Sequence, residues 1–227
     1  MRGWVAPGFD LGNHGYSHAD ANNLSAPQIE DEILRGEATL VPLMVKAGRK
    51  PTFFRFPFDH TGDTQAKHDA LSSFLSKHGY KLAICTMENS DFLFNNSYLR
   101  TLADKDAVSS SKLRSTYLAF TDSEIDYLAA LNKQVLGYEP PEVMVLHGNQ
   151  LNADMIEGVL ELFEKKHYKF VSLATAESDP AYAIPDTYIT QYGWMWGYRW
   201  AKELNVKVNG KAEPEPPEWI LNPAASQ

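Results

Sequence analysis

The sequence has one cysteine, no excess of positive charge and no long apolar run. Because Cys85 is the only cysteine among 227 residues, an intramolecular disulfide is excluded and cysteine usage does not report a redox compartment. The 29 acidic and 21 basic residues give a net charge of −8, which disfavours nucleic acid and anionic membranes as partners. No stretch approaches the roughly 20 apolar residues of a membrane span, and no signal peptide is visible after Met1.

What the sequence does contain is enough apolar material for a sizeable core, since 44% of the residues are hydrophobic, and the length suits one α/β domain. Gly3–Leu11 reads as the end of a strand or a passage from strand to loop, and four short apolar runs predict further strands: 52–56, 81–86, 143–146 and 169–173. Apolar residues at helical spacing predict helices between them: 25–45, 64–78, 92–102, 116–136 and 152–166. This alternation is typical of a parallel sheet or barrel, whose functional residues gather at the C-terminal ends of the strands.

The first predicted helix has the clearest local signals. Ser25 is suited to cap its N-terminus, with Gln28 as the partner residue of a capping box. Pro42 lies inside the apolar pattern, so we expect a kink or a break there. Further along, the polar stretch 109–115 separates the predicted helix 116–136 from the predicted helix 92–102.

Two histidines, His14 and His18, lie four residues apart in a glycine-containing segment. On a helical turn this spacing directs both imidazoles to one point, which suits a shared metal ion such as Zn, Co, Ni or Fe. Two histidines at this spacing are more often unrelated surface or core residues. By itself the spacing therefore favours the structural interpretation over a metal site.

Three further residues follow predicted strands. Arg55 precedes Pro57 and is suited to orient a carboxylate, but this segment alone favours a structural salt bridge. Asp91 is suited to hold a histidine in one tautomer, or else to cap the next helix. His147 ends the run 143–146, where it is suited to acid–base catalysis or to a place at the edge of the core.

The order of these motifs carries more information than any one of them. His-x-x-x-His, then Arg-x-Pro, then an Asp-bearing loop, then a strand that ends in His, resembles the NodB-homology polysaccharide deacetylases (carbohydrate esterase family 4). The amino-acid sequence of the segment 8–18 is similar to the metal-binding motif of that family, and the segment 146–154 extends the similarity. The resemblance spans roughly Gly3 to Leu173.

The resemblance implies a role for each residue. His14 and His18 would be metal ligands, most simply for zinc, with cobalt or nickel as alternatives. Arg55 would hold the catalytic carboxylate, Asp91 would tune His147, and His147 would protonate the leaving group. The reaction would be hydrolysis of a non-peptide carbon–nitrogen bond, which removes acetyl groups from N-acetylated sugars of a chitin-like or peptidoglycan-like glycan.

The resemblance also implies a fold, a distorted (β/α) barrel. We expect a single catalytic domain over 1–227, with a helical insertion at about 92–137 and an aromatic, proline-rich extension at about 180–227. The first motif of the family, Thr-Phe-Asp-Asp-Gly, supplies the general base and a third metal ligand. Asp10 is the one acidic residue before His14, and it does not match that motif. The chain therefore reads as N-terminally truncated, with the first strand or strands missing.

Two alternatives to an active amidase stay open, the first because the acid pair is missing and the second because the sequence does not distinguish an amidase from an esterase. The first is a non-catalytic or vestigial relative that binds glycans, in which the aromatic cluster Trp194–Trp200 stacks on sugar rings; core packing explains the same cluster equally well. The second is an esterase that acts on acetylated xylan. Members of the family are often periplasmic or secreted, but the sequence carries no address of its own.

Overall fold

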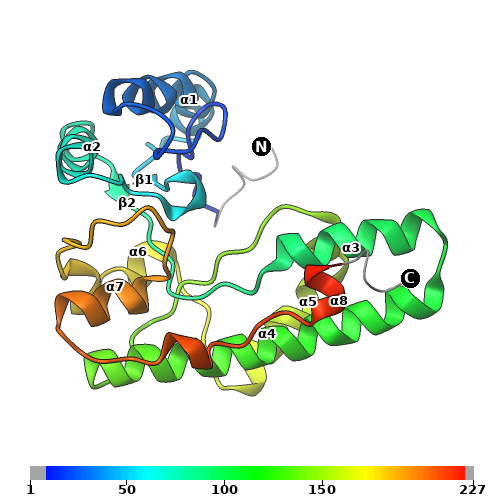
Figure 1. The fold of residues 1–227 in the computed structure, drawn as a ribbon. Coiled ribbons are helices and arrows are strands. Elements are labelled where there is room, and N and C mark those ends of the chain that lie inside the picture. Colours follow the sequence, from blue (N-terminus) through cyan, green and yellow to red (C-terminus); the bar gives the residue numbers. More distant parts are fainter. Residues whose placement is uncertain (1–8, 223–227) are drawn as a thin grey trace. The chain divides into compact units, whose positions relative to one another are not determined.

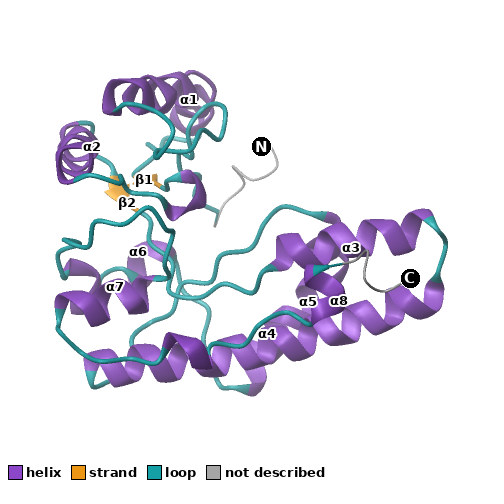
Figure 2. Ribbon diagram, in the orientation of Figure 1, coloured by secondary structure: helices purple, strands orange, loops and turns teal. Residues whose placement is uncertain are grey.

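The computed structural model describes residues 9–222, which form two compact units. The first unit contains residues up to 84 together with 187–194, and the second contains 85–186 together with the residues from 195 onward. Helices predominate in both, as Figures 1 and 2 show. Among residues 9–222, no helix has the length and apolarity needed to cross a membrane.

The first unit is built around a small βαβ arrangement. β1 and β2 pair in parallel, with Phe53 opposite Lys81, and Asn13 adds a parallel bridge to Phe54. A helix connects the two strands, as a parallel pair requires. The α/β prediction therefore holds for this unit, whose elements are α1 (Ala26–Lys46), β1 (Phe53–Phe54), η2 (Pro57–Asp59), α2 (Gln65–Lys77) and β2 (Lys81–Leu82).

The helices of the first unit begin where the sequence predicts. Ser25 and Gln28 form the predicted capping box of α1, and the Thr64 side chain accepts a hydrogen bond from the backbone of Lys67 at the start of α2. α1 continues past Pro42 to Lys46, so the proline does not end the helix. The apolar faces of both helices close a core over β1 that includes Ile29, Ile33, Phe54, Leu71 and Leu75.

The second unit is mainly helical. Its elements are α3 (Asp91–Ala103), α4 (Ala107–Leu136), α5 (Gln150–Lys165), α6 (Leu173–Ala176), η3 (Pro180–Ala183), α7 (Trp196–Glu203), η4 (Gly210–Ala212) and α8 (Glu218–Leu221). α3, α4 and α5 pack against one another, and α4 is the longest helix in Figure 1. A parallel bridge joins Met87 to Met144.

Two predictions for this unit are wrong. The polar stretch 109–115 does not interrupt the helix, because Asp106 caps α4 by accepting from the backbone of Val108 and Ser109 and the serines that follow extend its first turns. The run 169–173 is not a strand: Phe170 and Val171 are each 57% exposed, so they lack the burial that defines a central parallel strand.

The predicted barrel is not closed within residues 9–222. The described sheet has two strands, β1 and β2, and the run 143–146 contributes a single bridge at Met144. Most of the predicted strand end at Gly3–Leu11 lies outside the described residues. The described residues contain a parallel strand pair with a helical crossover. This arrangement belongs to the α/β class, but it does not form a closed barrel.

The C-terminal aromatic residues are mostly internal. Trp196, Tyr198 and Trp200 of α7 are buried, whereas Trp194 is 39% exposed. Core packing therefore explains the three residues of α7 better than stacking on sugars does. The segment 187–194 returns to the first unit, so the predicted extension at 180–227 serves both units.

Candidate metal and acid–base sites

The histidine pair lies on a loop and not on a helical turn. Its first residues continue the parallel sheet, because the Asn13 backbone donates to the Phe53 carbonyl (2.8 Å) and accepts from the Arg55 N–H (3.0 Å). His14 therefore follows a strand-like segment directly, at the same edge as the end of β1. Gly15, with φ +79°, then turns the chain.

This loop is fastened to α1 by polar contacts, one of which is buried. The Asn13 side chain donates to the Ile33 carbonyl (2.9 Å). The Ser17 backbone and hydroxyl both donate to one carboxylate oxygen of Glu32, at 2.6 and 2.7 Å. Burial alone would raise the pKa of Glu32, but the Ser17 hydrogen bonds and the charge of Arg35 outweigh it and the pKa is lowered. An ionised Glu32 thus holds the loop that carries both histidines.

The two imidazoles lie side by side, with ring centroids 5.0 Å apart and planes at 79°. His14 Nδ1 lies 2.7 Å from the Arg55 carbonyl oxygen, and since a carbonyl only accepts, Nδ1 carries the proton and the lone pair is at Nε2. Two imidazoles that bind one zinc ion through nitrogens at about 2.1 Å have centroids roughly 5 Å apart. The pair therefore fits two of the ligands of such an ion.

The charge state of His14 is also that of a ligand. Its pKa is lowered, chiefly because the surrounding protein disfavours the imidazolium, against the opposing effect of the hydrogen bond to Arg55. The nearby charges of His18 and Arg55 act in the same direction as burial. A neutral imidazole is the form that binds metal.

Arg55 is paired with a carboxylate of its own segment. Its Nη2 lies 3.1 Å from Asp59 Oδ2, and the two side chains are 20% and 15% exposed. Between them the backbone is unusual, because Phe58 and Asp59 have φ of 60° and 53°. The Phe58 ring meets His18 edge to face at 4.9 Å. The segment that contains Arg55 and Phe58 (the arginine segment) is thus in direct contact with the loop that carries His14 and His18.

Asp91 and His147 form a carboxylate–imidazole pair in the second unit. Asp91 Oδ1 lies 2.7 Å from His147 Nδ1, and Asp91 Oδ2 accepts from the His147 backbone N–H, also at 2.7 Å. The Asp91 side chain is 1% exposed and that of His147 is 51% exposed. The cap of α3 is Ser90, and the Asp91 carboxylate is directed to His147. Nδ1–H is fixed on the carboxylate, so proton exchange is directed to Nε2.

Further polar residues, which the sequence analysis did not identify, hold Asp91 in place. Asn152 Nδ2 donates to Asp91 Oδ2, and the Tyr117 hydroxyl donates to Asn152 Oδ1. Asn89 Nδ2 donates in turn to Tyr117 (2.7 Å). Burial would raise the pKa of Asp91, but the bonds from His147 and Asn152 prevail and lower it. The sequence signal for Asn152 was its place in the segment 146–154; Tyr117 and Asn89 left none.

The five residues singled out in the sequence divide between the units. His14, His18 and Arg55 belong to the first unit, and Asp91 and His147 to the second. Among residues 9–222, no group of three or more His, Cys, Asp or Glu side chains is arranged to hold a metal ion. Asp10, the acid upstream of the histidines, pairs with Arg49 at 3.2 Å.

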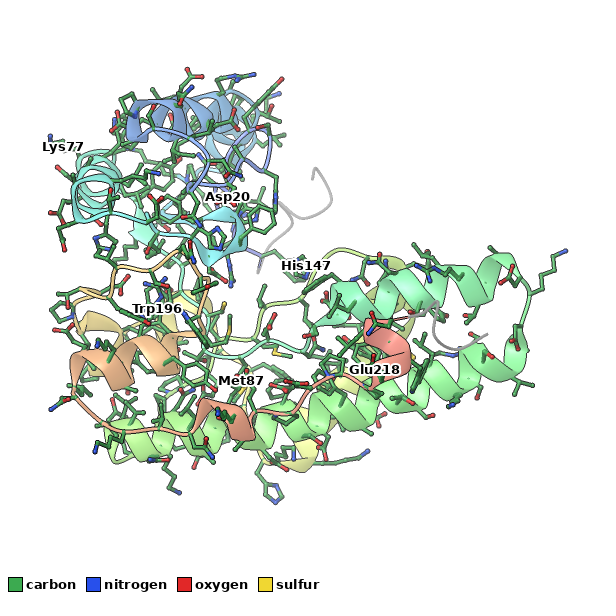
Figure 3. The ribbon with its side chains drawn as sticks, viewed as in Figure 1. Asp20, Lys77, Met87, His147, Trp196 and Glu218 are labelled. Carbon is green, nitrogen blue, oxygen red and sulfur yellow. The ribbon has the colours of Figure 1, made fainter. Side chains whose placement is uncertain are left out.

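The first unit contains a second carboxylate–imidazole pair, which the sequence analysis missed. Asp20 Oδ1 lies 2.7 Å from His60 Nδ1, and both side chains are largely buried. Figure 3 labels Asp20 in the first unit and His147 in the second. His60 lies within the same apolar segment as Arg55, but no local pattern links it to Asp20, which is 40 residues away.

Comparison with known proteins supports the family likeness for part of the chain. Residues 1–85 match the sequence model of a family described as polysaccharide deacetylase, so the resemblance is confirmed over that segment. No curated protein matches the chain. Two crystal structures of mutants of a CE4 family pseudoenzyme, one with restored enzymatic activity, are similar to it at 14% identity and a TM-score of 0.48. Each match covers 74% of this chain and 47% of the other.

Proposed function

We propose, from the premise that residues 1–85 belong to the polysaccharide deacetylase family, that the chain carries the site of a metal-dependent deacetylase of N-acetylated glycans. The observation that carries this proposal is the His14–His18 pair, with centroids 5.0 Å apart and the His14 tautomer fixed by the Arg55 carbonyl. A surface pair without function would not need one ring nitrogen to be held by a backbone carbonyl 41 residues away in the sequence.

His14 and His18 would hold the divalent ion through their ring nitrogens, and zinc, cobalt and nickel all accept imidazole. When bound, such an ion lowers the pKa of water and polarises the acetyl carbonyl. The two histidines supply two ligands, one fewer than the three protein ligands usual at a catalytic zinc. The Arg55–Asp59 pair keeps the arginine segment in register beside His18.

His147 would protonate the leaving amine from Nε2. Asp91 fixes the tautomer by accepting from Nδ1, and its buried carboxylate stabilises the imidazolium that forms when His147 takes up a proton. Phe92 lies against the ring at 5.8 Å and limits how it can turn. The substrate class that the family implies is a chitin-like or peptidoglycan-like glycan, and the βαβ unit would be one repeat of the distorted barrel that the family implies.

The test is acetate release from chitooligosaccharides and from peptidoglycan fragments, with the chain loaded separately with zinc, cobalt and nickel. We expect release that depends on metal and that His147→Ala lowers by about 10²–10⁴-fold, the usual contribution of acid–base catalysis. His167→Ala is the matched control, because His167 is a histidine of the same unit outside the site. Absence of release at every metal loading refutes the proposal. Acetylated xylan, assayed in parallel, separates an amidase from an esterase.

A second candidate is a non-catalytic glycan-binding relative. It is favoured by the observation that residues 9–222 contain no three-ligand group for a metal. Titration calorimetry with the same oligosaccharides separates the two, because binding without acetate release supports the second candidate alone.

A further inference from the structure

We propose that Asp20 and His60 are positioning residues for the His14–His18 pair. The hydrogen bond between Asp20 and His60 locks the loop that carries the two histidines against the segment 55–60. The proposal rests on the metal site of the proposed function. Asp20 lies two residues after His18, and His60 lies two residues after Phe58. The Asp20–His60 bond and the His18–Phe58 ring contact therefore join the same two segments at two points.

The segment that His60 closes has a conformation that needs support. Phe58 and Asp59 are consecutive non-glycine residues in the left-handed region, which side chains rarely adopt, and His18 is a third, with φ 61°. Such residues persist only where surrounding contacts determine them, and they gather at functional sites. Arg55 holds this turn from one side through Asp59, and Asp20 holds it from the other through His60.

A third support for this turn comes from the segment 187–194, which is distant in the sequence. The Asn22 backbone donates to Asp20 Oδ1 (2.8 Å), and the Asn22 side chain donates to the Gln191 carbonyl (2.8 Å). At Gly193 the chain presses on the turn so closely that an added Cβ would lie 1.8 Å from the Phe58 carbonyl oxygen. Segment 187–194 thus lies against both chain segments that the Asp20–His60 bond joins, at Asn22 and at Phe58.

The chemistry of the pair suits an orienting role. Asp20 Oδ1 lies 2.7 Å from His60 Nδ1 and also accepts from the Asn22 backbone N–H at 2.8 Å. A carboxylate that accepts from Nδ1–H fixes both the tautomer and the ring plane of His60. With both chain segments fixed, His18 needs no reordering when a metal ion binds. Outer contacts of this kind affect metal affinity by about 10–100-fold.

Two substitutions of His60 with nearly the same bulk separate orientation from packing. The amide nitrogen of His60→Asn takes the place of Nδ1 and can still donate to Asp20, whereas that of His60→Gln takes the place of Nε2 and cannot. We expect His60→Gln to weaken Zn²⁺ and Co²⁺ binding by about 10–100-fold and to alter the visible spectrum of bound Co²⁺. His60→Asn should retain most of the affinity of the wild-type chain.

Affinity is measured by competition with a chromophoric chelator, and far-UV circular dichroism checks folding. His78→Gln is the matched control, because His78 lies at the end of α2 and stacks on Phe74. Unchanged affinity and an unchanged Co²⁺ spectrum in His60→Gln, or equal losses in both His60 variants, overturn the positioning role and leave the proposed function standing. Absence of metal binding by the wild-type chain refutes the metal site of the proposed function, and this inference with it.

Discussion

Replacing Asp91 with asparagine is the sharpest test of the structure of the second unit. The carboxylate is 1% exposed and accepts from His147 Nδ1, from the His147 backbone and from Asn152. Asparagine keeps the shape and one oxygen but places an amide NH₂ where the second oxygen stood. If the oxygen continues to accept from the backbone and Asn152, the NH₂ faces His147 Nδ1, which must then give up its proton and become an acceptor.

The expected cost follows from these contacts. Two hydrogen bonds lose the charge of their acceptor, which costs about 1 kcal/mol each, since bonds to charged groups are worth about 1.5–3 kcal/mol and neutral ones about 0.5–1.5. The third bond reverses its direction and forces the other tautomer of His147. We expect Asp91→Asn to lower the free energy of unfolding by about 2–4 kcal/mol, less than the full loss of a buried ion pair because the amide still fills the site.

The pH dependence has a definite sign. Burial opposes ionisation of Asp91, but its hydrogen bonds prevail and the folded-state pKa lies below the ordinary value of 3.8. The contribution of the ionised form to stability is therefore present above that ordinary value and is lost as the pH falls through the folded-state pKa. The difference between wild type and Asp91→Asn should be full at pH 7 and shrink as the pH falls below about 4.

The assay is urea denaturation followed by tryptophan fluorescence, which reports mainly on the second unit because Trp196, Trp200 and Trp219 lie there. The matched control is Asp104→Asn, an exposed aspartate at the end of the same helix. Equal stability of wild type and Asp91→Asn at pH 7, or a difference that grows on acidification, would refute the reasoning.

Two further predictions concern stability elsewhere in the molecule. Burial and two neighbouring acidic residues raise the pKa of Glu124 to about 8, so its ionisation destabilises the fold as the pH rises toward that value. In urea denaturation, the stability of Glu124→Gln should match that of wild type near pH 4 and exceed it at pH 8 by roughly 2–5 kcal/mol. Lower stability of the variant at pH 8 would contradict a neutral buried acid. Gly193→Ala should lower the free energy of unfolding by about 1–3 kcal/mol in thermal denaturation, because its Cβ would collide with the Phe58 carbonyl oxygen. Gly210→Ala should be tolerated, because the nearest atom to its Cβ would be 3.4 Å away. Equal melting temperatures for the two variants would rule out the close approach at Gly193.

The elements that the sequence predicted correctly are those with local signals. Ser25 and Gln28 are three residues apart, and a capping box needs nothing beyond its own turn. The spacing of apolar residues likewise located α2 and α5 to within about two residues. The run 169–173 misled because an apolar sequence does not say whether a neighbouring strand is present to bury it.

The sequence by itself determined the order of the motifs. With it came the likeness of residues 1–85 to the polysaccharide deacetylase family and the choice of His14, His18, Arg55, Asp91 and His147 as candidates. Tertiary structure alone decided which groups meet them. Asp20 reaches His60 across 40 residues and Asn22 reaches Gln191 across 169, and no periodic pattern records such distances. A helix cap or an apolar stripe is specified within a few residues, whereas a hydrogen bond between two loops depends on where the whole chain has placed them.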